Sequence, residues 1–77
     1  MKLTELALQV ASPPDRERCV IEILSGAEQV CEVNDEYGEP VIEIYPNPNG
    51  GPWLIDLAAL QQALAKARDS IRLNQKH

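Results

Sequence analysis

Apolar residues recur with two different spacings along the 77 residues of this chain. Residues 2–11 carry apolar side chains at the spacing of one helical face, namely Leu3, Leu6, Ala7 and Val10. We predict an amphipathic helix here, which ends before Pro13 because the residue that precedes a proline disfavours the helical conformation. A strand is the alternative, because Leu6, Leu8 and Val10 also occupy every second position.

Three short runs rich in β-branched residues predict strands, at residues 18–24, 28–33 and 41–45. Because the links between them are short, an antiparallel meander is the natural pairing. Gly38 lies in the second link, where a tight turn can use its positive φ. Residues 46–53 hold three prolines, two asparagines and two glycines, which exclude regular structure. Residues 53–55 can then add a short edge strand.

The remainder of the chain predicts one long helix from Asp56 to about Leu73. Asp56 is a suitable N-cap, and Ile55 and Leu60 stand at the two positions of a hydrophobic staple. One stripe of this helix is apolar and comprises Leu57, Leu60, Leu64, Ala67 and Ile71. The predicted fold is therefore α+β in a single domain, residues 1–77: an N-terminal helix, a three-stranded antiparallel β-meander, and a long C-terminal helix packed on one sheet face.

Strand alternation sorts the strand residues into two faces. We assign the less charged face to the core beneath the helix, and it comprises Cys19, Ile21, Ile23, Cys31, Val33, Ile42 and Ile44. The opposite face mixes carboxylates with apolar residues, namely Val20, Glu22, Leu24, Glu28, Val30, Glu32, Val41, Glu43 and Tyr45. We expect this second face to be exposed, unless the N-terminal helix covers it.

Charge is distributed unevenly and limits the classes of partner. The net charge is −5, and residues 17–45 hold eight acidic residues against one arginine, a balance of −7. An acidic chain lacks the basic face that direct nucleic-acid binding requires. No apolar run approaches the roughly 20 residues of a membrane span, and the N-terminus does not resemble a secretory signal. We therefore expect a cytoplasmic protein.

Catalytic and metal-binding constellations are not apparent in the sequence. The single histidine is His77, the last residue, and the two cysteines, Cys19 and Cys31, form no CxxC motif. Two cysteines without histidine neighbours do not make a structural zinc site, which needs four ligands. We predict two buried thiols, with a cross-strand disulfide as the alternative. We expect no metal, no cofactor and no enzymatic activity.

The acidic and apolar face is the candidate binding surface. One interpretation is an ordinary solvated sheet face, and the other is a docking surface for a basic protein partner, since interfaces need apolar contact as well as charge. In the second case Glu22, Glu32 and Glu43 would steer the partner and Tyr45 would anchor it. Trp53 either fills the edge of the small core or contributes a further anchor at the interface.

Residues 38–71, GEPVIEIYPNPNGGPWLIDLAALQQALAKARDSI, combine a strand, a tryptophan-containing loop and a capped helix. This arrangement resembles small bacterial immunity proteins of toxin systems, and the ending ALAKARDSI is similar to the helix of HicB-type antitoxins. The resemblance implies a protein that binds and silences another protein, for example a nuclease toxin. The alternative is a structural or homodimeric module whose exposed sheet face or edge pairs with itself.

Overall fold

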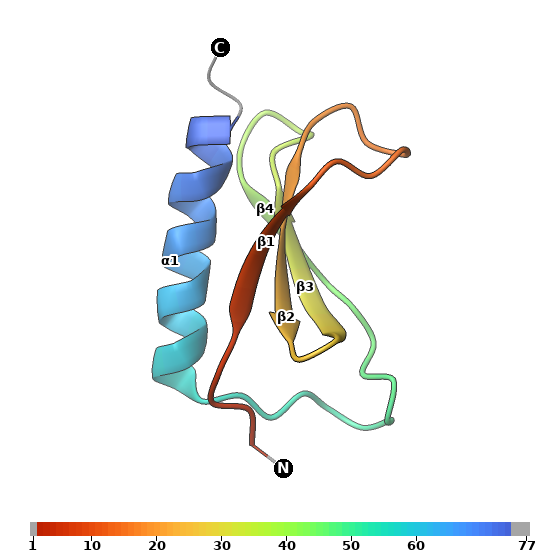
Figure 1. The fold of residues 1–77 in the computed structure, drawn as a ribbon, viewed down its shortest axis with the longest axis vertical. Coiled ribbons are helices and arrows are strands. Elements are labelled where there is room, and N and C mark those ends of the chain that lie inside the picture. Colours follow the sequence, from red (N-terminus) through yellow and green to blue (C-terminus); the bar gives the residue numbers. More distant parts are fainter. Residues whose placement is uncertain (1, 75–77) are drawn as a thin grey trace.

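The computed structural model describes residues 2–74 and shows a sheet with one helix against it (Figure 1). The elements follow the chain as β1 (Ala7–Ala11), β2 (Val20–Ser25), β3 (Glu28–Asn34), β4 (Val41–Ile44) and α1 (Leu57–Asn74). The strand order is β1-β2-β3-β4, and every neighbouring pair is antiparallel. The predicted meander and C-terminal helix are confirmed, with a fourth strand that the sequence interpretation had assigned to a helix.

The prediction of an N-terminal helix is wrong, because residues 7–11 form β1. The strand pairs with β2 so that Leu8 lies opposite Ile23 and Val10 opposite Ile21. The alternation of Leu6, Leu8 and Val10 therefore decided the structure, because pairing with β2 outweighs a helical preference in so short a segment. Within residues 2–74, no helix covers the sheet face opposite α1.

The start of the chain is tied to the start of α1 by a single parallel bridge between Leu3 and Ile55. Leu3 N donates to Leu54 O at 2.9 Å, and Asp56 N donates to Leu3 O at 2.9 Å. Asp56 then caps α1, since its Oδ2 accepts from Ala59 N at 3.1 Å. The predicted cap is confirmed, and the extended segment at residues 53–55 amounts to this one bridge.

The core lies between α1 and the first three strands. Its buried members are Ile21, Ile23, Val30, Cys31, Val33, Ala63, Ala67 and Ile71. Leu60 lies at the edge of this core beside Ile55, and Leu64 packs against the core, as the predicted stripe required. Leu57 does not belong to the stripe, because it is 69% exposed on the first turn of the helix.

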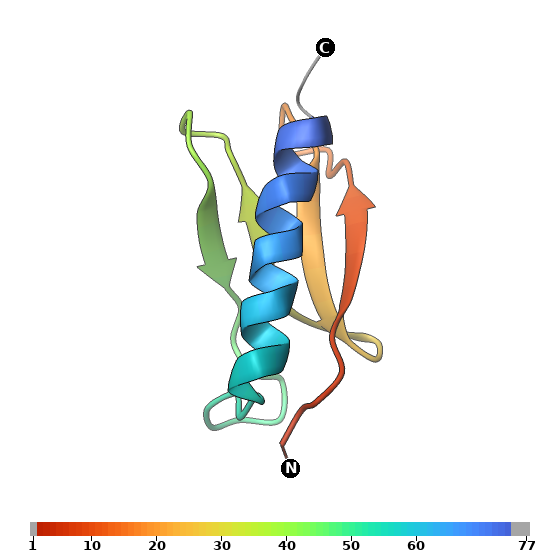
Figure 2. The ribbon, with the colours of Figure 1, turned by 90° about the vertical axis from the view of Figure 1, so that its left-hand side faces the viewer.

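Strand β4 is left uncovered, because α1 packs against β1, β2 and β3 only (Figure 2). Ile42 and Ile44 alternate with the same face as Val33 and Cys31, as predicted, yet they are 43% and 67% exposed. The expectation that the helix buries both isoleucines is therefore wrong. One helix is about 10 Å wide, so it spans two or three strands of a sheet rather than four.

Val30 lies on the other face of β3 than the predicted alternation requires. The pairing of β2 with β3 shifts between Ile23 and Leu24, so that Ile23 lies opposite Cys31 and Leu24 opposite Gln29. This bulge inserts Val30 as an extra residue, and Val30 joins the core instead of the opposite face. Strict alternation in the sequence gives no sign of such an insertion.

Candidate protein-binding surfaces

Three glutamates form a row across the sheet face that carries no helix. Glu22 lies opposite Glu32, and Glu32 lies opposite Glu43, on strands β2, β3 and β4. The prediction that they share a face is confirmed, but their exposure differs. Glu32 is only 4% exposed, so the expectation that its carboxylate is exposed is wrong.

Arg16 and Asn34 hold the carboxylates of Glu32 and Glu43 together. Arg16 Nη2 lies 2.9 Å from Glu32 Oε2 and 2.6 Å from Glu43 Oε2. Asn34 Nδ2 donates to the same two oxygens at 2.9 and 2.8 Å. The pKa of Arg16 is raised: burial lowers it, but the hydrogen bond to Glu43 and the charges of both carboxylates outweigh that effect.

Tyr45 completes this cluster from the end of β4. Its hydroxyl donates to Glu32 Oε1 at 2.6 Å. Burial, followed by the hydrogen bond to Glu32 and its negative charge, raises the pKa of Tyr45. Glu32 therefore has partners on both of its oxygens, and the Tyr45 hydroxyl is engaged by its own sheet.

The loop between β1 and β2 folds across this face, which explains the burial. Arg16 belongs to this loop, and its side chain reaches the glutamates on β3 and β4. Two further bonds hold it to the β3–β4 loop: Arg18 Nη1 to Asp35 Oδ2 at 3.2 Å, and Glu17 N to Glu36 Oε1 at 3.1 Å. Val20 and Asn34 consequently have no exposed surface although no helix covers them. Sequence reasoning did not identify Arg16, because a residue in an irregular loop has no periodicity that assigns it to a face.

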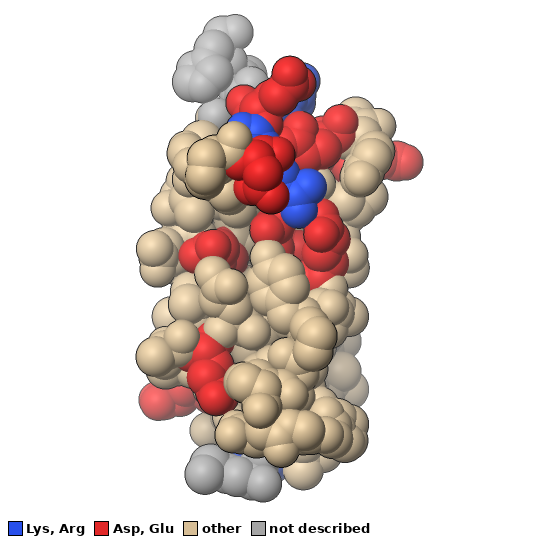
Figure 3. Space-filling model, turned by 90° about the vertical axis from the view of Figure 1, so that its right-hand side faces the viewer, with Lys and Arg blue, Asp and Glu red and all other residues tan. Residues whose placement is uncertain are grey.

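The surface on this side is divided into two halves (Figure 3). Asp and Glu side chains gather over one half around Lys or Arg, and the other half is largely uncharged. The loops at the charged end expose Asp15, Glu17 and Glu39, with Tyr37 77% exposed beside them. We call Asp15, Glu17, Glu36 and Glu39 the acidic end. Glu22 is partly exposed and is bonded by Gln29 Nε2 at 2.8 Å.

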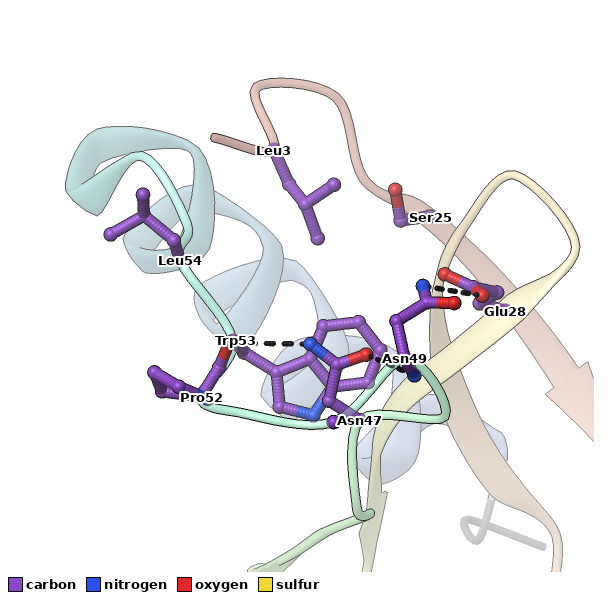
Figure 4. A pocket seen from close by; sticks show the side chains of 9 residues that line it. Leu3, Ser25, Glu28, Asn47, Asn49, Pro52, Trp53 and Leu54 are labelled. Atoms are coloured by element: carbon purple, nitrogen blue, oxygen red, sulfur yellow. Dashed lines mark hydrogen bonds between the residues drawn. The ribbon is translucent and has the colours of Figure 1, made fainter. Parts of the chain in front are cut away.

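Trp53 lies apart from the row of glutamates. Its side chain packs against the core and its Nε1 donates to Tyr45 O at 2.7 Å. Trp53 also lines a hollow of about 610 Å³ between the 46–56 segment and the β2–β3 turn (Figure 4). Asn47 Nδ2 donates to Pro52 O at 3.2 Å within the loop that borders this hollow, and Asn49 Nδ2 donates to Glu28 Oε2 at 3.4 Å, which ties the loop to the start of β3.

A second hollow, the β4 groove, runs between β4 and the first turns of α1. Its volume is about 350 Å³. Apolar side chains line it, with Trp53 forming part of one wall, and they are Val30, Cys31, Ile42, Ile44, Trp53, Ile55 and Leu60. This groove was not foreseen, because the sequence interpretation placed Ile42 and Ile44 beneath the helix.

The thiols differ from each other and are not joined by a disulfide. Cys31 is buried, and this burial raises its pKa. Cys19 precedes β2 and is partly exposed, with its sulfur 3.3 Å from Ser12 Oγ. The prediction of burial is therefore confirmed for Cys31 and wrong for Cys19. Cys19 lies outside the strand, so the alternation of inward and outward side chains does not apply to it.

Within residues 2–74, no three His, Cys, Asp or Glu side chains are grouped so that they could hold a metal ion. His77 lies outside the described residues. Among the described residues, no helix has the length and apolar character needed to cross a bilayer.

Comparisons of the chain with protein-family models, curated protein sequences and solved structures found no match.

Proposed function

We propose that this chain is a small acidic protein-binding module of the immunity or inhibitor type, which works in the cytoplasm by occluding a basic protein partner such as a toxin or nuclease. The single observation that carries the proposal is the division of the helix-free sheet face. Carboxylates gather at one end of it, and uncharged surface adjoins them (Figure 3). Such a combination suits an interface, where charge accelerates encounter and apolar area is buried on contact.

The acidic end is better placed than the row of glutamates to attract a basic partner. Glu32 is buried, and Glu43 shares with it the positive charge of Arg16 and the amide donor of Asn34. In contrast, Glu17 and Glu39 are exposed on two loops that are bonded to each other, so the acidic end is held in place before binding. We therefore assign the steering role to Glu17, Glu36 and Glu39, and retain Glu22 and Tyr45 as neighbours at the margin of the contact.

The test begins with capture of partners from a lysate of the source organism at low salt, followed by identification of the captured protein. We expect a basic protein whose association rate falls steeply with added salt, as steered association does. The double variant Glu17→Lys, Glu39→Lys should lower that association rate at least tenfold at low salt. Its dissociation rate should change much less, because rim charges act mainly on encounter.

The matched control is Glu5→Lys, Asp69→Lys, which makes the same change in net charge at exposed positions that do not belong to the acidic end. This control should stay within about twofold of the unaltered chain if position, rather than total charge, determines the rate. Equal losses for both double variants, or a captured partner that is acidic, would remove the support for this proposal.

A further inference from the structure

Strand β4 presents an open edge. It pairs with β3 on one side, and no strand among residues 2–74 pairs with its other side. Tyr45 N donates to Val30 O at 3.0 Å, so the main-chain groups of Tyr45 point toward β3. From there, the direction of the main-chain groups alternates from one residue of β4 to the next. The main-chain groups of Val41 and Glu43 consequently point to β3, whereas those of Ile42 and Ile44 point outward. Two residues therefore offer N–H and C=O groups to an incoming strand.

The β4 groove lies on the helix side of this same edge. Ile42 and Ile44 are 43% and 67% exposed, and their side chains form its rim. In a strand added beside β4, every second side chain would lie on the groove side, next to these isoleucines. Apolar residues at two alternating positions would thus find both hydrogen-bonding groups and an apolar surface.

Charged side chains lie on both sheet faces beside the open edge of β4. Arg68 follows Leu60 and Leu64 at intervals of four residues, so it lies on the same flank of α1, beyond the groove. Its side chain is 59% exposed, and its ion pair with the adjacent Asp69 measures 3.8 Å. The chain direction of β4 is opposite to that of α1 (Figure 2), so Arg68 stands toward the Val41 end. On the other sheet face, the Glu43 side chain is 41% exposed.

A second copy of this chain fits the edge poorly. Antiparallel pairing of two β4 strands through the outward groups would set Ile42 of one copy opposite Ile44 of the other. That register also sets Glu43 opposite Glu43, and like charges in that position are destabilising. It further sets Pro40 opposite Pro46, where neither residue has an N–H to donate. A strand of different sequence avoids both conflicts.

We propose that β4 and its groove bind an extended segment of another protein, which adds to the sheet antiparallel to β4. Apolar residues of the segment lie opposite Ile44 and Ile42, with a polar residue between them opposite Glu43, whose carboxylate Arg16 already binds. An acidic residue two positions after the second apolar one lies near Arg68. This proposal does not rest on the proposed function, because the acidic end is formed by the loops at one end of the sheet.

The probe is a synthetic peptide with blocked ends and the sequence Thr-Val-Lys-Val-Thr-Glu-Thr, titrated into the full chain. Binding is followed by the fluorescence of Trp53, which lines the groove, and by the amide NMR shifts of Ile42 and Ile44. We expect saturable binding, with the largest shifts on those two amides. A peptide with both valines replaced by serine should bind at least tenfold more weakly.

Three variants locate the site. Ile44→Lys removes apolar surface from the groove, and Ile44→Pro removes the outward N–H at an edge position where proline is tolerated. Each should weaken binding at least tenfold, and Arg68→Glu should weaken it at least threefold. The control is Val10→Lys, because Val10 is 50% exposed on the opposite edge strand; this variant should bind within twofold of the unaltered chain.

Other outcomes overturn the proposal. Absence of saturable binding at millimolar peptide, or equal weakening by Val10→Lys and Ile44→Lys, would show that the β4 edge is not the site. A chain that is already dimeric, with the Ile42 and Ile44 amides protected from exchange before peptide is added, would assign the edge to a second copy. None of these readouts uses the basic partner, so they leave the proposed function to its own test.

Discussion

The carboxylates of Glu32 and Glu43 lie opposite each other on β3 and β4 and share the same guanidinium and amide nitrogens. Two like charges in this position would destabilise the strand pair if nothing lay between them. Arg16 and Asn34 convert the repulsion into a bonded cluster, and in doing so hold the β1–β2 loop across the sheet. The cluster therefore gives this face a cover that no helix provides.

Asn34→Asp should destabilise the chain strongly. Asn34 is fully buried, and its Nδ2 donates to both carboxylates. The substitution removes that donor and adds a third carboxylate, so the free energy of unfolding should fall by about 3 kcal/mol or more. Urea unfolding followed by circular dichroism measures this change.

Gln29→Glu is the matched control for the buried amide. Gln29 also donates to a glutamate, Glu22, at 2.8 Å, but it does so on the exposed surface. The same amide-to-acid change should therefore lower the free energy of unfolding by less than about 1 kcal/mol. Similar losses in the two variants would contradict the view that burial makes the Asn34 position critical.

Tyr45 should make the stability fall at alkaline pH. Its pKa is raised above the ordinary value of 10.0, so the folded chain keeps the phenolic proton at a pH where the unfolded chain releases it. The unfolded state then binds fewer protons, and the free energy of unfolding declines as the pH rises above about 10. Below that pH the contribution is fully present.

Tyr45→Phe should flatten this alkaline decline, measured as the urea midpoint between pH 8 and pH 11. Tyr37→Phe serves as the control, because Tyr37 is 77% exposed in a turn. Cys31 has a raised pKa as well and contributes equally in both variants, so it does not affect the comparison. Identical alkaline slopes for the two variants would argue against the Tyr45–Glu32 bond.

Most elements of the fold follow from local patterns. Strands β2, β3 and β4 and the capped helix α1 were predicted within a few residues, because each has a clear periodicity and a turn or cap at its ends. β1 was not predicted as the favoured element, because residues 2–11 fit both the helical and the strand spacing. The strand forms because β2 offers an edge to pair with, and a local pattern does not show that edge. The bulge at Val30 is likewise a property of two paired strands rather than of one.

The candidate sites were predicted less well, because they depend on tertiary contacts between segments that are distant in the sequence. Alternation placed Glu22, Glu32 and Glu43 on one face, as observed, but exposure depends on Arg16 in a distant loop. The β4 groove depends on how far α1 extends over the sheet, which is set by packing against β1 to β3. Neither relationship is encoded in a local spacing.

Ile71→Ala should be among the most damaging changes in α1. Ile71 is fully buried against the sheet, so its truncation leaves a cavity and should lower the free energy of unfolding by about 2–5 kcal/mol. Leu57→Ala is the control, because Leu57 is 69% exposed on the same helix. Its effect should stay below about 1 kcal/mol, and thermal or urea unfolding of both variants tests the assigned helix face.

The two thiols should react with a maleimide reagent at very different rates in the native chain. Cys19 is partly exposed and should be labelled without unfolding, whereas Cys31 is 1% exposed and burial raises its pKa, which leaves little reactive thiolate. Mass spectrometry after brief labelling at pH 8 should show one adduct, located on Cys19, and denaturant should add the second. Cys19→Ser should abolish rapid labelling, and Cys31→Ser should leave it unchanged. Rapid labelling of Cys31 in the Cys19→Ser variant would mean that the core under α1 opens readily, and slow labelling of both would restore the inward position first expected for Cys19.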